Sequence, residues 1–228
     1  MYFSQISPAE GLERAAAHER LHSAYAEHQW LWRFFPGADG SPCNFIFRRW
    51  DRRDLPCYYV VSRCPPASGV PAWRVQTREY APRLAAGEQL EFDLRVNPVV
   101  TVTSDGKSRR HDVVMQEKKR LLQARGLTRW RDWVDDDKPA SYEIVRASCC
   151  QWLHKRAERL GFSIDEASLS VEAYQQHRGK GQELRFSTVD FVGTLTVLAP
   201  EAMLQTLYTG IGHAKAFGCG LLLVRRAV

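Results

Sequence analysis

The sequence predicts an α+β fold built from two similar halves, each containing a sheet with helices on one face. Strand-like and helix-like segments alternate along all 228 residues, each half has the size of a single-sheet domain, and 44% of the residues are apolar. This order fits two tandem ferredoxin-like (RRM-like) domains, with a glycine-rich loop before the last strand. We expect the first domain to cover residues 1–104 and the second to cover residues 105–228.

The first half is predicted to begin with a strand at residues 1–6 and a long helix. Ser7 followed by Pro8 predicts the start of that helix, and Pro36-Gly37 predicts its end. Apolar runs and alternations then predict strands at 44–50, 57–62, 72–80 and 88–104, the last broken at Asn97-Pro98.

The second half alternates in the same way. Periodicity predicts helices at 113–125 and 142–160, and then a hairpin from 168–176 and 183–198. A short helix at 200–208, with proline at its start, precedes a glycine-rich turn and a last strand at 219–224.

Composition excludes several classes of protein. No stretch approaches the roughly 18 to 20 apolar residues of a membrane helix, and the first residues lack the features of a signal peptide. The six cysteines show no CxxC pair, which predicts reduced thiols and no metal site. His18 and His22 are four residues apart, but no third ligand is near them in sequence, so a solvated face is expected. We therefore expect a cytoplasmic protein with no membrane partner, no metal and no cofactor.

Positive charge is concentrated in one segment. The chain carries a net charge of +6, whereas residues 95–131 alone hold ten Lys or Arg and three Asp or Glu. A cluster of one sign on an otherwise balanced chain is typical of a protein with a polyanion partner, although a solvated basic helix has the same composition. The charge thus suggests nucleic acid without proving it.

The most distinctive stretch lies just before the last predicted strand. Within eleven residues it holds four glycines, one histidine and one lysine: Gly210, Gly212, His213, Lys215, Gly218 and Gly220. Glycines let the backbone approach a ligand closely, and the N–H groups of such a turn suit phosphate oxygens. The stretch is not a Walker loop, because no glycine precedes a Lys-Ser or Lys-Thr pair.

This loop and the strand after it resemble the C-terminal signature of the CRISPR repeat-processing endoribonucleases, above all those of the CasE type. Arg95-Val-Asn97-Pro98 resembles the Arg-x-Asn-Pro of that family, and Tyr25-Ala-Glu-His28 resembles its Tyr-x-x-His. The resemblance covers essentially the whole chain in order.

The resemblance implies two ferredoxin-like domains and metal-independent cleavage of the repeat stem-loop of CRISPR precursor RNA. The 2′-hydroxyl would attack, leaving a 2′,3′-cyclic phosphate or 3′-phosphate and a 5′-hydroxyl. The enzyme would then stay bound to the 3′ hairpin within Cascade, beside the backbone subunit at that end. The alternatives are a non-cleaving subunit that caps a guide RNA and an unrelated ferredoxin-like nucleic-acid binder.

Tyr25 and His28 are the candidate catalytic pair. Three residues apart on a helix, they lie on one face and can reach one phosphate, and histidine serves as acid or base near neutral pH. Arg33 is expected to lend positive charge to the transition state. Periodicity alone favours a core histidine at position 28, and it is the family resemblance that favours catalysis. Spacing leaves the role of Tyr25, as acid, base or orienting group, open.

Stem-loops are recognised chiefly by shape and backbone charge. We expect the stem phosphates to be lined by Lys107, Arg109, Arg110, Lys118 and Lys119. Arg178 and Lys180, at the hairpin tip beside His177, are expected to reach the base of the stem, unless they only keep a sheet edge soluble. The Arg95–Asn97 strand end and the glycine loop with His213 complete the expected RNA-binding set.

Overall fold

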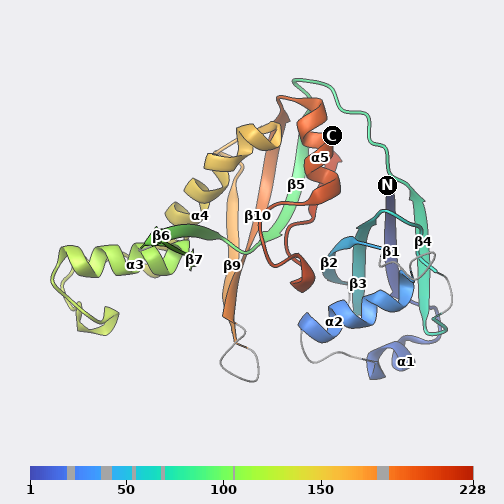
Figure 1. Cartoon of the computed structure of the whole chain (residues 1–228), viewed down its shortest axis with the longest axis horizontal. Helices are drawn as coiled ribbons and strands as arrows, with labels where there is room; N and C mark the ends of the chain where they lie inside the picture. The colour runs from blue at the N-terminus through green and yellow to red at the C-terminus, as the bar shows by residue number, and fades with distance from the viewer. Residues whose placement is uncertain are drawn as a thin grey trace.

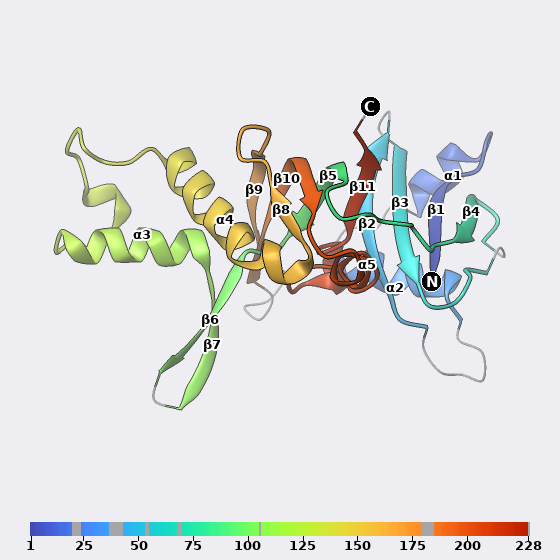
Figure 2. The ribbon, with the colours of Figure 1, turned by 90° about the horizontal axis from the view of Figure 1, so that it is seen from above.

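The computed structural model describes residues 1–19, 24–36, 43–52, 55–67, 70–104, 106–178 and 185–227. Its two main sheets lie side by side along the longest axis of the molecule, and a helical arm extends beyond the C-terminal sheet (Figures 1 and 2). The arrangement is α+β, as the sequence predicts.

The first sheet is antiparallel and has the order β2-β3-β1-β4. Its strands are β1 (Tyr2–Pro8), β2 (Phe45–Arg52), β3 (Leu55–Ser62) and β4 (Trp73–Glu79). Between β1 and β2 the chain forms α1 (Glu13–His18), α2 (Ala24–Leu31) and the short 3-10 helix η1 (Trp32–Phe34). The strand order is that of a ferredoxin-like unit, but the described residues between β3 and β4 form no second helix.

The second sheet repeats this order in the C-terminal part of the chain. It contains β5 (Gln89–Val96), β8 (Phe162–Ile164), β9 (Ser170–Arg178), β10 (Arg185–Val197) and β11 (Leu222–Arg226). The order is β11-β5-β10-β8, and β9 also pairs with β10, so β8 and β9 act as one interrupted strand. The helices α4 (Ser141–Ala157) and α5 (Pro200–Thr209) provide the two ferredoxin-like connections.

Each sheet packs its apolar face against its helices. In β10 the alternating residues Val189, Phe191, Leu195 and Val197 are fully buried in the core of the second sheet, as the period of two along a strand requires. A separate cluster that includes Leu31 and Phe47 joins the first sheet to α2. The two cores leave the opposite sheet faces and the connecting turns available for a site.

An insertion between β5 and α4 carries most of the basic segment. It consists of a ribbon formed by β6 (Val99–Ser104) and β7 (Lys107–Asp112), followed by α3 (Val113–Ala124). The Asp112 side chain caps α3 by accepting a hydrogen bond from the amide of Met115 at 2.8 Å. The ribbon and α3 project from the body of the molecule (Figure 2).

The predicted domain boundary between residues 104 and 105 is wrong. It assigns β5 to the first domain, but β5 pairs with β10 and β11 in the middle of the second sheet. The chain passes from one sheet to the other in residues 80–88. Strand pairing between residues about a hundred positions apart leaves no local signal at the boundary.

The long helix predicted from Pro8 is also wrong at its start. Strand β1 extends to Pro8, which pairs with Trp73 at the end of the β1–β4 ladder, a position that a proline tolerates. Helical structure begins five residues later, in α1. Among the described residues, no helix is long and apolar enough to cross a membrane.

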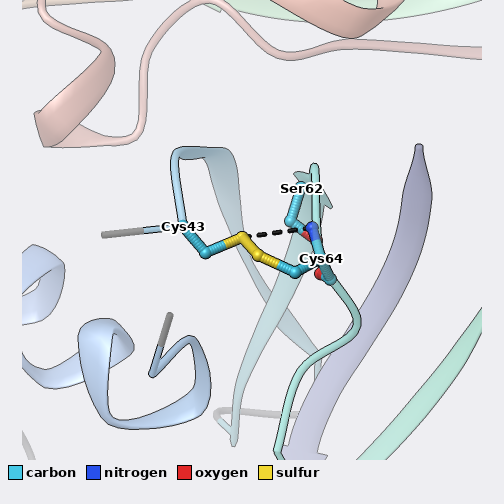
Figure 3. The surroundings of a disulfide bond; sticks show 3 residues. All are labelled: Cys43, Ser62 and Cys64. Carbon is cyan, nitrogen blue, oxygen red and sulfur yellow. Dashed lines mark hydrogen bonds between the residues drawn. A yellow bond between two sulfur atoms is a disulfide. The ribbon is translucent and has the colours of Figure 1, made fainter. Parts of the chain in front are cut away.

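A disulfide joins Cys43 and Cys64, so the prediction that all six thiols are reduced is wrong for these two (Figure 3). The two residues flank β2 and β3 and extend the register in which Phe45 faces Ser62, which brings their Cα atoms to 6.2 Å. The Cys64 amide also donates to Cys43 Sγ at 3.1 Å. The sequence argument concerned only the redox compartment and contained nothing about this pairing.

Candidate functional site

His28 lies on α2, and the residue is half-buried. Its ring contacts aromatic rings from η1 and β2, with centroid distances of 5.7 Å to Trp32, 5.4 Å to Phe45 and 6.2 Å to Phe47. Burial lowers the pKa of His28 below its usual 6.5. The imidazole is therefore mostly neutral at pH 7 and can accept a proton.

Tyr25 belongs to the same helix, three residues before His28. Its side chain lies outside the described residues, so the predicted pairing with His28 rests on helical spacing alone. His22, Arg178 beyond its backbone, and Lys180 are likewise outside the described residues.

The structure does not bring Arg33 to His28. The Arg33 Nη1 atom pairs with Glu19 Oε2 at 3.3 Å, and the same oxygen accepts hydrogen bonds from the indoles of Trp30 and Trp73. Trp73 begins β4, at the opposite edge of the sheet from β2, where the ring neighbours of His28 lie. Five residues along a helix correspond to a rotation of about 140°, which explains why the two side chains diverge.

The glycine-rich loop lies against the helix that carries His28. After α5 the chain forms η5 (Lys215–Phe217), which packs on α2 and β2. A Cβ atom added at Gly218 would lie 3.3 Å from Cε2 of Phe47, the ring that stacks with His28. Loop and helix, nearly two hundred residues apart in sequence, thus share one aromatic side chain.

Several of the predicted phosphate-binding glycines serve the loop itself. A Cβ atom at Gly210 would lie 2.8 Å from the carbonyl oxygen of Gly220, so two backbone segments cross here at a distance that only glycine permits. The amides of Gly210, Gly218 and Gly220 donate to carbonyls of Thr206, Lys215 and Arg95, respectively. These three amides are consequently used within the protein, contrary to the expectation that they bind phosphate.

Gly212 and His213 are exposed in the same loop. An isolated β-bridge joins His213 to Asn97 and so connects the loop to the end of β5. Burial lowers the pKa of His213, and the charges of Arg110, Lys215 and Arg156 lower it further. Positive groups from β7, α4 and the loop therefore gather around this histidine.

Arg95 and Asn97 have structural partners. Arg95 donates two hydrogen bonds of 2.7 Å to the carboxylate of Asp190, and Asn97 is buried with its amide donating to the Ser187 carbonyl at 2.7 Å. The Asn97 side chain is therefore engaged within the protein, and the contact of Asn97 with RNA stays a prediction. Both side chains hold the end of β5 against β10 and so set the position of the glycine loop.

The predicted basic surface is present on the insertion. Lys107, Arg109 and Arg110 are exposed along β7, whereas Lys119 is exposed on α3 and Lys118 lies over the Trp130 ring at 5.3 Å. All of these side chains except that of Lys118 are open to solvent and free of the cores, as phosphate contacts require.

Sequence reasoning missed Arg156 and overlooked the ring neighbours of His177. Arg156 lies over Trp152 at 4.2 Å and donates to the Trp152 carbonyl at 2.8 Å, and burial lowers its pKa. His177 stacks on Phe186 at 4.7 Å, and Phe186 in turn stacks on Phe217 of η5 at 4.8 Å. Neither position belongs to a motif, and only the charge of Arg156 was visible in the sequence.

Comparison with known proteins decides the family. A family model described as "CRISPR associated protein" matches residues 1–226. The chain belongs to this family. The chain is 28% identical over 225 residues to the CRISPR system Cascade subunit CasE of Escherichia coli strain K12, covering 97% of this chain and 98% of that relative.

Two further comparisons agree with this assignment. The CRISPR-associated endoribonuclease Cse3 of Thermus thermophilus is 27% identical over 175 residues, which is 68% of each protein. A solved structure of the CRISPR endoribonuclease Cse3 bound to a 19-nucleotide RNA matches this family member with a TM-score of 0.69 and 23% identity over 98% of both chains. That likeness confirms the predicted fold of tandem ferredoxin-like domains.

Proposed function

We propose that this protein is an endoribonuclease that cleaves the repeat stem-loop of CRISPR precursor RNA without a metal ion and remains bound to the 3′ hairpin of its product in Cascade. The observation that carries the proposal is the position of His28. A half-buried imidazole on α2 lies beside the glycine-loop turn, and exposed cations of β7 stand near the same loop. The relatives named as a Cascade subunit and as an endoribonuclease support it.

The chemistry needs two proton transfers and stabilisation of charge. The 2′-oxygen forms a bond to phosphorus while the bond to the 5′-oxygen breaks. The 2′-hydroxyl proton goes to a base, and the leaving oxygen receives one from an acid. A neutral His28 suits the base, and Tyr25, on the same helical face, is the candidate for the second proton transfer. The products are a 2′,3′-cyclic phosphate and a 5′-hydroxyl.

The basic surface suits the stem. Exposed cations on β7 and α3 neutralise phosphates, and the loop with Gly212, His213 and Lys215 lies between this surface and His28. Arg178 and Lys180 stay proposed contacts at the base of the stem. We assign the protein to the cytoplasm, where precursor RNA is made.

The test is cleavage of the repeat hairpin in excess EDTA, with a 2′-deoxy substitution at the cut site as the control. The proposal expects cutting of the all-ribose hairpin only. Cutting of the deoxy substrate would contradict it, because the attacking oxygen would then come from elsewhere.

A non-cleaving subunit that caps a guide RNA is the second candidate. Asn97 is buried and the amides of three loop glycines hydrogen-bond within the protein, which is compatible with binding alone. His28→Ala separates the two: an enzyme loses cleavage by about 10²–10⁴-fold with binding retained. A capping subunit shows no cleavage before the substitution either.

A further inference from the structure

The glycine-rich loop contains a short turn, η5, that begins with a lysine and packs on α2, the helix that carries His28. Lys215 is the first residue of η5, and η5 packs on α2 (Figure 1, dark red turn beside α2). Phe47 lies between them, because its ring stacks with His28 at 6.2 Å and is adjacent to Gly218 at the end of η5. The turn that begins with Lys215 therefore lies near the helix that carries His28, although 187 positions separate the two residues.

The backbone holds Lys215 in a defined position. Ala214, the residue before it, adopts a left-handed conformation with φ +60°, which residues other than glycine rarely adopt. The aliphatic part of the Lys215 side chain packs against Gly220. Its Cγ atom lies 3.4 Å from the position that a Cβ atom added to Gly220 would take. The side chain is half-buried as a result.

The Lys215 ammonium differs from the guanidinium groups of Arg33 and Arg95, because each of these arginines is paired with a carboxylate. Arg33 pairs with Glu19, and Arg95 pairs with Asp190. Among the residues that the structure describes, no carboxylate forms an ion pair with Lys215. Burial lowers the pKa of Lys215. A half-buried cation without a counterion gains most when an anion arrives.

We propose that Lys215 is a catalytic residue of the nuclease, whose ammonium donates a hydrogen bond to a non-bridging oxygen of the scissile phosphate and stabilises the charge that develops there. This rests on the proposed function. The lysine keeps its proton throughout: the bond from the 2′-oxygen to phosphorus forms, the bond to the 5′-oxygen breaks, and the protons move through the Tyr25–His28 pair. The lysine supplies the positive charge that the sequence assigned to Arg33.

The test compares Lys215→Met, which keeps the packed stem and removes the charge, with Lys215→Arg, which keeps a cation. Arg83→Ala, in the exposed connection between the sheets, removes one positive charge elsewhere and is the matched control. Single-turnover cleavage rates are measured at saturating protein in EDTA. Dissociation constants are measured on the uncleavable 2′-deoxy hairpin, and thermal unfolding verifies that each variant is folded.

Loss of one preorganised donor to a developing oxyanion costs about 10²–10³-fold in rate. We expect that loss for Lys215→Met at saturation, with a much smaller change in the dissociation constant and recovery of much of the rate by Lys215→Arg. A sulfur in place of the contacted non-bridging oxygen should slow the wild type more than Lys215→Met, because that variant no longer donates to this oxygen.

If Lys215→Met cleaves at the wild-type rate at saturating protein, or if only its dissociation constant changes, the assignment of Lys215 is overturned. The proposed function is unaffected by either result. A wild-type protein that does not cut in EDTA would instead overturn the proposed function. An Arg83→Ala variant as slow as Lys215→Met would also overturn the assignment, because net charge would then explain the effect.

Discussion

Arg48 of β2 and Asp190 of β10 form an ion pair that joins the two sheets, with Nη1 3.1 Å from Oδ1. The Arg48 side chain is only 6% exposed, and its second nitrogen contacts Asp93 of β5, also at 3.1 Å. Asp190 in turn holds Arg95. One carboxylate therefore connects the first domain to the end of β5, which hydrogen-bonds with the glycine loop, so the relative position of His28 and the loop depends on it.

Asp190→Asn should destabilise the protein by about 3–5 kcal/mol, because it leaves Arg95 without its charged partner and leaves the buried Arg48 with Asp93 alone. Urea unfolding measures the change. The matched control is Glu91→Gln, which removes a carboxylate from an ion pair with Arg225 whose side chains are 40% and 80% exposed, and should cost about 0–1 kcal/mol. Equal losses in the two variants would show that the pair between the sheets contributes no more than a surface pair.

The cleavage rate should fall at acidic pH. Burial lowers the pKa of His28 from 6.5, so the neutral base persists below that value and is lost as the pH falls through the lowered pKa. Single-turnover rates at saturating protein between pH 4.5 and 8 should therefore rise about tenfold per unit on the acidic limb, with a midpoint below 6.5. An acidic limb with its midpoint above 6.5 would contradict a neutral His28 acting as the base.

Binding should depend on salt through the cations of β7. The triple variant Lys107→Ala, Arg109→Ala, Arg110→Ala should weaken binding to the deoxy hairpin and reduce the slope of log affinity against log salt by about 0.7–0.9 for each phosphate that is no longer neutralised. A second triple variant, Arg83→Ala, Arg225→Ala, Arg226→Ala, removes the same charge from the connection between the sheets and the end of β11 and should leave the slope unchanged. Equal slopes for both triple variants would mean that net charge, and no defined surface, binds the stem.

Reduction should destabilise the first sheet. Loop-closure entropy for a disulfide that joins residues 21 positions apart predicts a loss of about 3 kcal/mol when it is opened. Thermal unfolding with and without dithiothreitol measures this loss, and the Cys43→Ala, Cys64→Ala variant should be insensitive to the reductant. Cleavage by the reduced protein should persist at temperatures where it remains folded, because the bonds that the structure describes for these cysteines involve neither His28 nor η5. A reductant-sensitive double variant would place the effect at another cysteine.

Local patterns accounted for the order of the elements. The helices α3, α4 and α5 and the hairpin of β9 and β10 were all predicted close to their observed bounds, because apolar periodicity, prolines and glycines act within a few residues. The Tyr-x-x-His spacing likewise located a half-buried histidine on a helix. Helical spacing cannot show what packs against that helix.

The sequence by itself thus determined two α+β halves, a basic segment, a helix with the Tyr-x-x-His spacing and a glycine-rich loop. Only the tertiary structure decided that β5 belongs to the second sheet, that Arg33 faces Glu19, that Asn97 is buried and that Lys215 lies beside α2. Each of these depends on contacts between residues far apart in the chain, such as Val96 with Val189. Such contacts form because two sheets must bury their apolar faces and satisfy their polar groups together, and no short segment carries that information.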